Sequence, residues 1–477
     1  MKKQMGKRAP SKIEAFSTML ILLASVGFGA MKGLSAIPFL MISTVWVCLI
    51  GLRCGYSWNE LEEGMVEKAK TLAGTTYILI TIGFIIGTWM FSGTIPVMVY
   101  YLLNIINPSF IIVLSFIISA VVAAIIGTSW GTAGTVGVVM ISLANAQGVS
   151  MPMVAGAVVS GVHIGQILSP MSDMSNLATT EGNTDVMSVI RRCMRYAAPT
   201  ILFCIVVYTL FGFTGSAGVS SLEQVSGIKN QIAEYFNTSP LVLLPLVLLV
   251  FLSIKKIAVL PTMILSGLTA VMIGMIMNNF DLSFAINTMY RGFNISTIAT
   301  AEVSPILQSL TNRGGMMMMS GAIVMMFTAL AFAGAIIKIG ALQVIVETLF
   351  SKIKSKGGLA LATVSTGLVT ALATSDSYMT LILPCDLMKK KYNDSGYASI
   401  NVAAVSQSVG ALIMGIIPWT STAIYMSQVT GVPVLKYAPF AFFLWVTPIF
   451  AVLVSMLPNG FVKLTDEVVE NNEAAGL

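Results

Sequence analysis

The feature that most constrains this chain is a series of long apolar runs, separated by short segments that hold most of its charge. The run at 110–126 reads FIIVLSFIISAVVAAII and contains no charged residue. Of the 477 residues, 56% are hydrophobic and 10% are charged, whereas about a quarter of the residues of a soluble domain are charged. A soluble core cannot bury this much apolar surface. We therefore predict an all-α polytopic membrane protein whose surroundings are the lipid bilayer.

We expect about ten full spans. Their ranges are 13–31, 34–52, 73–106, 152–190, 196–214, 240–254, 257–277, 315–350, 398–435 and 438–457. Three of them are too long for one straight helix of about 20 residues and carry FSGTIP at 91–96, SPMSDMSN at 169–176 and IPWTST at 417–422. Gly, Ser, Thr and Pro at mid-membrane predict helices that break, which bilayers tolerate only where the break is buried in protein or lines a wet cavity.

Two further pairs of apolar segments bend at polar motifs. The segments 110–126 and 130–145 meet at GTSWG, and 358–372 and 377–388 meet at TSDS. We interpret each pair as a hairpin that dips into the membrane. Two short full spans are the alternative in each case, and both interpretations return the chain to its starting side.

The net charge of +6 comes from short basic clusters between apolar runs, a pattern that predicts topology and not nucleic-acid binding. With the spans above, every cluster falls on the cytoplasmic side: the N-terminus, Arg53, 191–195, 255–256, 351–356 and 389–391. Both termini are then cytoplasmic and the expected location is the cell membrane. The hairpin at 110–145 has uncharged flanks and opens outward, whereas the hairpin at 358–388 has lysine-rich flanks and opens inward.

Because the two hairpins open on opposite sides of the membrane, the chain is expected to contain a duplicated unit in inverted orientation. Thr128-Ser129 can be laid on Thr374-Ser375, Pro170 on Pro418, and Gly93 on Gly334, in the same order. The expected parts of the chain are 1–72 (N-terminal helices and a linker helix at 57–70 that is cytoplasmic and solvated), 73–190 (repeat one, with its broken helix at 152–190), 191–314 (connecting helices), 315–435 (repeat two, with its broken helix at 398–435) and 436–477 (last span and cytoplasmic tail). Inverted repeats, broken helices and hairpin tips that meet near the midplane are the anatomy of a secondary transporter.

The hairpin tips and helix breaks supply the candidate ion and proton site. Its residues are Thr128, Ser129, Ser172, Asp173 and Asn176 in repeat one, and Thr374, Ser375, Asp376, Ser377, Thr420, Ser421 and Thr422 in repeat two. These oxygen ligands suit a hard cation such as Na⁺. We expect half-helix C-termini to turn their negative ends toward it.

Asp173 and Asp376 stand in apolar surroundings, where an aspartate costs about 2.5–3.5 kcal/mol on insertion scales. A buried carboxylate that binds either a proton or Na⁺ yields exchange of the two ions. The alternative is that each aspartate only caps a broken helix through backbone N–H groups.

Two other titratable residues are candidates for a role. His163, the only histidine, is either a pH sensor or proton relay or a neutral group hydrogen-bonded inside the bundle. Lys338, placed after the expected break in the helix at 315–350, either pairs with an acid, holds an anionic substrate, or reaches toward the inner surface.

The motifs GTSWGTAGTVG at 127–137, SPMSD at 169–173 and SDSYMTLILP at 375–384 resemble the NhaC family of Na⁺/H⁺ antiporters. That family also contains a malate-H⁺/lactate-Na⁺ antiporter and amino-acid carriers, and the resemblance covers nearly the whole chain. It implies inverted repeats with re-entrant hairpins and makes Asp173 and Asp376 ion or proton sites.

The sequence therefore predicts a secondary Na⁺/H⁺ antiporter that works by alternating access, with Na⁺ and H⁺ as transported ions and no cofactor. The alternative is a Na⁺- or H⁺-coupled carrier of a small carboxylate or amino acid. No HExxH, Ser/His/Asp or Walker pattern indicates an enzyme or an ATP-driven pump. Whether the protein is a homodimer stays open.

Overall fold

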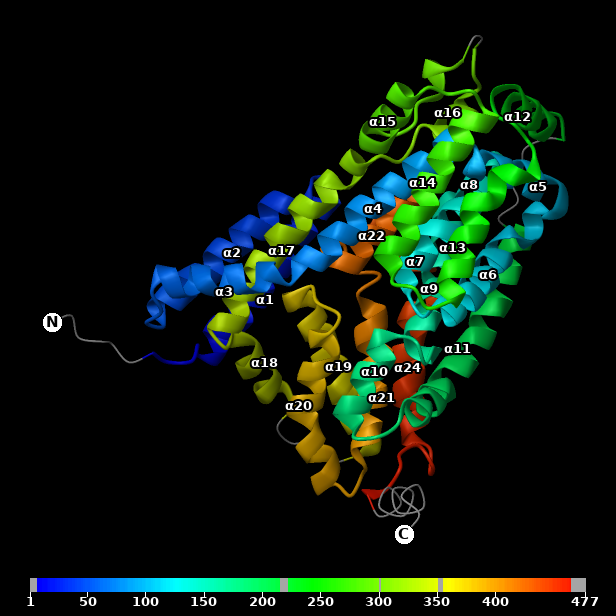
Figure 1. Cartoon of the computed structure of the whole chain (residues 1–477). Helices are drawn as coiled ribbons and strands as arrows, with labels where there is room; N and C mark the ends of the chain where they lie inside the picture. The colour runs from blue at the N-terminus through cyan, green and yellow to red at the C-terminus, as the bar shows by residue number, and fades with distance from the viewer. Residues whose placement is uncertain (1–6, 215–221, 300–301, 351–354, 465–477) are drawn as a thin grey trace.

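The computed structural model describes residues 7–214, 222–299, 302–350 and 355–464 (Figure 1). Within these ranges every regular element is a helix, and one isolated β-bridge joins Tyr397 to Lys463. Nine described helices are long and apolar enough to cross a membrane, or up to 11 spans if each of two bent pairs counts as one. The all-α polytopic fold class is confirmed.

The helices follow one another with short connections. In chain order the α-helices are α1 (Lys12–Met31), α2 (Ala36–Arg53), α3 (Trp58–Lys70), α4 (Leu72–Phe91), α5 (Thr94–Ile105), α6 (Ile111–Ile126), α7 (Ser129–Thr132), α8 (Val138–Ala146), α9 (Met151–Leu168), α10 (Asp173–Gly182), α11 (Val186–Thr214), α12 (Leu222–Tyr235), α13 (Leu244–Ile254), α14 (Val259–Met277), α15 (Leu282–Arg291), α16 (Pro305–Thr311), α17 (Ser320–Lys338), α18 (Ala341–Phe350), α19 (Lys356–Thr374), α20 (Met379–Asp394), α21 (Ser399–Ile413), α22 (Ser421–Thr430), α23 (Val434–Tyr437) and α24 (Phe442–Met456). Short 3-10 helices are η1 (Pro108–Phe110), η3 (Pro240–Leu243), η4 (Ile295–Thr297), η5 (Met316–Met319) and η6 (Ala438–Phe440), and η2 (Ala133–Gly137) is a π-helix.

The three long apolar ranges break where the sequence predicted. Helix α4 ends at Phe91 and α5 begins at Thr94, directly after Gly93. The φ of Gly93 is 80°, a left-handed conformation that glycine adopts without strain. Residues 169–172 separate α9 from α10, and residues 414–420 separate α21 from α22. The predicted range 152–190 is too long at its end, because α11 begins at Val186.

A fourth break separates α17 from α18 at Gly340, which has a φ of 71°. The break expected within 315–350 is therefore present, but Gly334 lies inside α17 and does not form it. Lys338 therefore precedes the break and does not follow it. The proposed match between Gly93 and Gly334 does not pair two helix breaks, and the inverted repeat stays a prediction.

Both polar motifs between apolar pairs form tight reversals. The chain turns at Gly127 between α6 and α7, and at Ser375–Tyr378 between α19 and α20. The first limb of each pair, Pro108–Ile126 and Lys356–Thr374, is long enough to cross a membrane by itself. Re-entrant hairpins and short full spans thus both remain compatible with these lengths.

Two groups of helices flank the site described below. Helices α1, α2, α3 and α17, here named the N-terminal arm, pack together on the left of Figure 1. Helices α10, α19, α20, α21 and α24 form the lower part of the bundle in the same view. The arm has its own apolar core, which the end of α19 and Trp419 also join.

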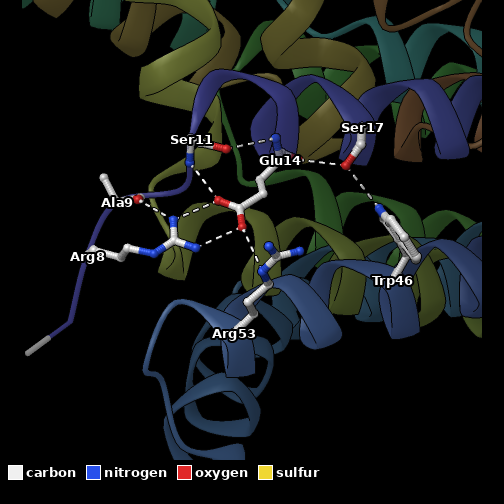
Figure 2. A network of polar contacts seen from close by, with 7 residues as sticks. All are labelled: Arg8, Ala9, Ser11, Glu14, Ser17, Trp46 and Arg53. Atoms are coloured by element: carbon white, nitrogen blue, oxygen red, sulfur yellow. Dashed lines mark hydrogen bonds and ion pairs between the residues drawn. The ribbon is translucent and has the colours of Figure 1, made fainter. Parts of the chain in front are cut away.

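The start of the N-terminal arm is fastened by a polar network at the ends of α1 and α2 (Figure 2). Both guanidinium ends of Arg8 contact the Glu14 carboxylate, at 2.7 and 2.8 Å, and Arg53 Nε lies 3.3 Å from the same group. Glu14 also completes a capping box with Ser11. Arg8 therefore lies beside the basic end of α2, and the cytoplasmic placement of this end stays a prediction.

Helix α3 is more than the solvated linker that its charge pattern predicted. Leu61 and Gly64 are buried against the arm, and Lys338 Nζ of α17 lies 3.0 Å from a carboxylate oxygen of Glu63. A Cβ atom added at Gly334 of α17 would lie 2.4 Å from the carbonyl oxygen of Gly64. The two helices therefore touch through backbone, and this close contact fixes where the end of α3 points.

We expect Gly334→Ala to destabilise the protein by about 1–3 kcal/mol, because the new methyl group has no space against α3. Gly321→Ala in the same helix is the matched control, since nothing lies within 4 Å of its added Cβ and alanine favours a helix. Thermal unfolding of the two purified variants measures the difference. Equal melting temperatures would contradict the backbone contact.

Candidate functional site

A cavity of about 500 Å³ lies where the N-terminal arm meets the turn of α19–α20 and the starts of α10 and α22. Seven of the twelve predicted ion-site residues line it: Thr128, Asp173, Ser375, Asp376, Ser377, Ser421 and Thr422. They come from both halves of the chain, so the structure brings together the motifs that the sequence analysis paired. The charged side chains among the described lining residues are Lys68, Asp173 and Asp376.

Asp376 is held at both carboxylate oxygens. Oδ1 accepts hydrogen bonds from the backbone N–H groups of Tyr378 and Met379, at 2.8 and 3.3 Å, and so caps the start of α20. Oδ2 lies 2.5 Å from Nζ of Lys68, at the end of α3. Helix capping therefore accounts for Oδ1 of Asp376, and Oδ2 binds a cationic group.

Asp173 shows the same division. Oδ1 accepts from the backbone N–H of Met174 in the first turn of α10, at 2.9 Å. Oδ2 accepts a hydrogen bond from the hydroxyl of Tyr378 at 2.5 Å. Because Tyr378 follows Asp376 by two residues, the turn of α19–α20 connects both aspartates within one cavity.

The turn of α19–α20 is also bound to the break between α21 and α22. Ser375, at the left-handed φ of 55°, donates its hydroxyl to the carbonyl oxygen of Trp419 at 2.8 Å. Ser421 donates its hydroxyl to the carbonyl oxygen of Ser375 at 3.2 Å. These bonds satisfy backbone groups that the two interruptions leave free, as a membrane interior requires.

The turn between α6 and α7 reaches the cavity through Thr128 and Trp130. The ring of Trp130 stacks on Tyr425 of α22, with 4.4 Å between the centroids and 11° between the planes. The hydroxyl of Tyr425 donates to the carbonyl oxygen of Trp130 at 2.5 Å. The GTSWG motif is therefore packed against α22, the second half of the broken helix in 398–435.

Five predicted site residues lie outside the cavity lining, and in three of them the hydroxyl donates to a backbone carbonyl. Ser172 donates to Gln166, Thr374 to Thr370, and Thr420 to Met414. The other two are Ser129, which is fully buried with an unpartnered hydroxyl, and Asn176, whose amide donates to the carbonyl of Ser172. Ser172 and Thr420 also cap α10 and α22, so much of the predicted ligand set serves the interrupted helices.

Helix C-termini and helix N-termini both meet at the cavity. The C-caps of α3 and α19, Thr71 and Ser375, line it, and so do several helix starts. The lining includes the first residues of α10, α20 and α22, namely Asp173, Met379 and Ser421. Helix N-termini carry positive partial charge. The two aspartates neutralise part of that charge, which explains why each caps a helix start.

His163 and Lys338 lie outside the cavity lining. His163 is fully buried in α9, its Nδ1 is 2.7 Å from the carbonyl oxygen of Val159, and its ring lies against Gly415 in the break after α21. This geometry fits the hydrogen-bonded alternative, and a relay role stays a prediction. Lys338 pairs with Glu63, so of its three alternatives the structure contains the pairing with an acid.

The sequence analysis missed Lys68, Tyr378, Gln166 and Trp130, all of which line the cavity. Trp130 stands inside GTSWG and Tyr378 directly follows TSDS, so their positions carried a usable signal. Lys68 stands in a helix of mixed charge, where no pattern separates it from the neighbouring surface lysine Lys70.

A polytopic helical fold with a carboxylate-lined cavity between interrupted helices defines a membrane transporter. The profile of the Na⁺/H⁺ antiporter family matches residues 11–213 and 161–457. An uncharacterized Na⁺/H⁺ antiporter of Haemophilus influenzae is 33% identical over 466 residues, which cover 97% of this chain and 100% of that protein. This chain belongs to the Na⁺/H⁺ antiporter family.

Two further relatives come from Bacillus subtilis. The Na⁺/H⁺ antiporter NhaC is 32% identical over 429 residues, which cover 89% of this chain and 92% of the relative. The malate-2H⁺/Na⁺-lactate antiporter is 31% identical over 434 residues, with coverage of 91% and 92%. The family therefore contains members named for ion exchange alone and for exchange with organic acids.

The cavity can be tested with cysteine labelling, because the five native cysteines are all buried. We expect Ser377→Cys, which lines the cavity, to react with a water-soluble maleimide in membrane vesicles. Thr374→Cys, three residues earlier and fully buried, is the matched control and should stay unlabelled. Mass spectrometry of the labelled protein measures both, and equal labelling would contradict this cavity.

Proposed function

We propose that this protein exchanges Na⁺ for H⁺ across the cell membrane by alternating access, and that Asp173 and Asp376 bind the exchanged ions. One observation carries the proposal: both carboxylates face the same cavity, and each directs one oxygen toward it. A carboxylate binds a proton or a metal cation at a given oxygen, and the two exclude each other. Membership of the Na⁺/H⁺ antiporter family supports the same activity.

The neighbouring oxygen groups suit Na⁺ in chemistry. The hydroxyls of Thr128, Ser377 and Thr422 line the cavity beside the carboxylates. Hard cations prefer such oxygen ligands over sulfur or imidazole. Protons and Na⁺ would reach the aspartates through the cavity, and we propose that it opens toward the basic, cytoplasmic face in this conformation.

We expect Asp173→Asn and Asp376→Asn each to abolish Na⁺-driven proton movement, because the amide of asparagine binds neither proton nor Na⁺ as a carboxylate does. Asp394→Asn, at the exposed end of α20, removes a carboxylate far from the cavity and should transport as the unmodified protein does. A pH-sensitive dye in proteoliposomes with an imposed Na⁺ gradient gives the rates. A wild-type rate of Na⁺-driven proton movement in either variant would show that the substituted aspartate does not bind the exchanged ions.

A second candidate function is exchange of these ions with a small organic anion. The cavity volume of about 500 Å³ falls in the range of small-molecule sites. Lys68 and the N-termini of α10, α20 and α22 offer positive charge to a carboxylate. The similarity to the malate-2H⁺/Na⁺-lactate antiporter favours the same class of solute.

The two functions differ in what a Na⁺ gradient does alone. We expect protons to move in proteoliposomes that contain no organic solute, since the carboxylates suffice to bind both ions. The measurement is repeated with malate and with lactate on either side of the membrane. Proton movement that begins only when one of these acids is present would replace simple ion exchange by coupled solute transport.

A further inference from the structure

Lys68 forms an unusual ion pair for this molecule. Its side chain is 12% exposed, and that of its partner Asp376 is 14% exposed. In each of the other ion pairs among the described residues, at least one side chain is 30% or more exposed. A lysine ammonium loses most of its hydration at such a depth, so it needs the carboxylate as a partner.

The backbone of Lys68 is held in place because α3 packs closely on α17 within the N-terminal arm. Gly64, one turn earlier on α3, is in backbone contact with Gly334 of α17. Glu63 is paired with Lys338 of the same helix. The ammonium of Lys68 therefore extends into the cavity from a fixed helix, whereas Asp376 belongs to the turn of α19–α20.

Lys68 occupies the oxygen of Asp376 that a transported cation would use. The backbone N–H groups of Tyr378 and Met379 already bind Oδ1, and Lys68 Nζ lies 2.5 Å from Oδ2. The contact distance leaves no room for a metal ion between Nζ and Oδ2. Two cations at the same oxygen atom repel each other, so each weakens the binding of the other.

We propose that Lys68 is a tethered cation that competes with Na⁺ for Asp376, so that Na⁺ binding releases the turn of α19–α20 from α3. This inference rests on the proposed ion exchange at Asp376 and adds a residue that sets the apparent affinity for Na⁺. It also gives ion binding a mechanical consequence. The ion pair joins the N-terminal arm to the turn that carries Asp376 and Tyr378, and displacement of Lys68 removes that connection.

The test is the Na⁺ concentration that gives half-maximal proton movement in proteoliposomes at one fixed pH. We expect Lys68→Gln to lower this concentration about tenfold, because removal of a nearby positive charge favours a cation at Asp376. Lys68→Arg keeps the charge and should stay close to the unmodified protein. Lys70→Gln removes an exposed lysine two residues away and should leave the value unchanged.

A gain in apparent Na⁺ affinity separates this inference from a merely structural role, because damage to the fold does not tighten ion binding. The same shift should appear in the Na⁺ concentration that raises the melting temperature of detergent-solubilised Lys68→Gln, and it should vanish when Asp376→Asn is added. An unchanged or higher half-maximal Na⁺ concentration in Lys68→Gln would overturn the inference. Absence of Na⁺-driven proton movement in the unmodified protein would instead overturn the proposed function.

Discussion

The structure depends on one constraint of the bilayer: a helix that stops inside the membrane must find partners for the backbone groups it leaves free. At the break between α9 and α10, the carbonyl oxygen of Gln166 accepts hydrogen bonds from Ser172, Ser175 and Gln407. At the break between α21 and α22, Thr420 donates to Met414 and caps the next helix. At both breaks, small polar residues therefore supply the partners that the interrupted backbone needs.

The same constraint places the aspartates. Helix starts that face a cavity present free N–H groups, and a carboxylate oxygen is a strong acceptor for them. Asp173 and Asp376 each use one oxygen in this way, and the second oxygen of each contacts a side chain of the cavity lining, Tyr378 and Lys68 respectively. Capping and ion binding are therefore compatible roles of one side chain. The cap also orients the carboxylate, so the second oxygen has a defined direction before an ion arrives.

How far the sequence predicted the molecule follows from the range of each interaction along the chain. The broken helices and turns were predicted because Gly, Ser, Thr and Pro inside an apolar run are a local signal. The contact of Gly334 with α3 was not predicted, because a glycine in close contact with another helix and a glycine at a helix break look alike in sequence. Lys68 was missed because its partner Asp376 lies 308 residues away along the chain. A solvated and a docked amphipathic helix share one charge pattern, so only the packing of α3 on α17 distinguishes them.

The charges of the lining connect the two kinds of cargo that the family members are named for. With both aspartates ionised, the described lining carries two negative charges and the single positive charge of Lys68, a net charge of −1. One Na⁺ then neutralises the cavity. With both aspartates protonated the same lining carries +1, from Lys68 alone, and the positive ends of α10, α20 and α22 lose the carboxylate charges that oppose them. In the proposed function, protonation would change the charge of the lining from −1 to +1, and this change is the physical basis for proposing a carboxylate as a second class of cargo.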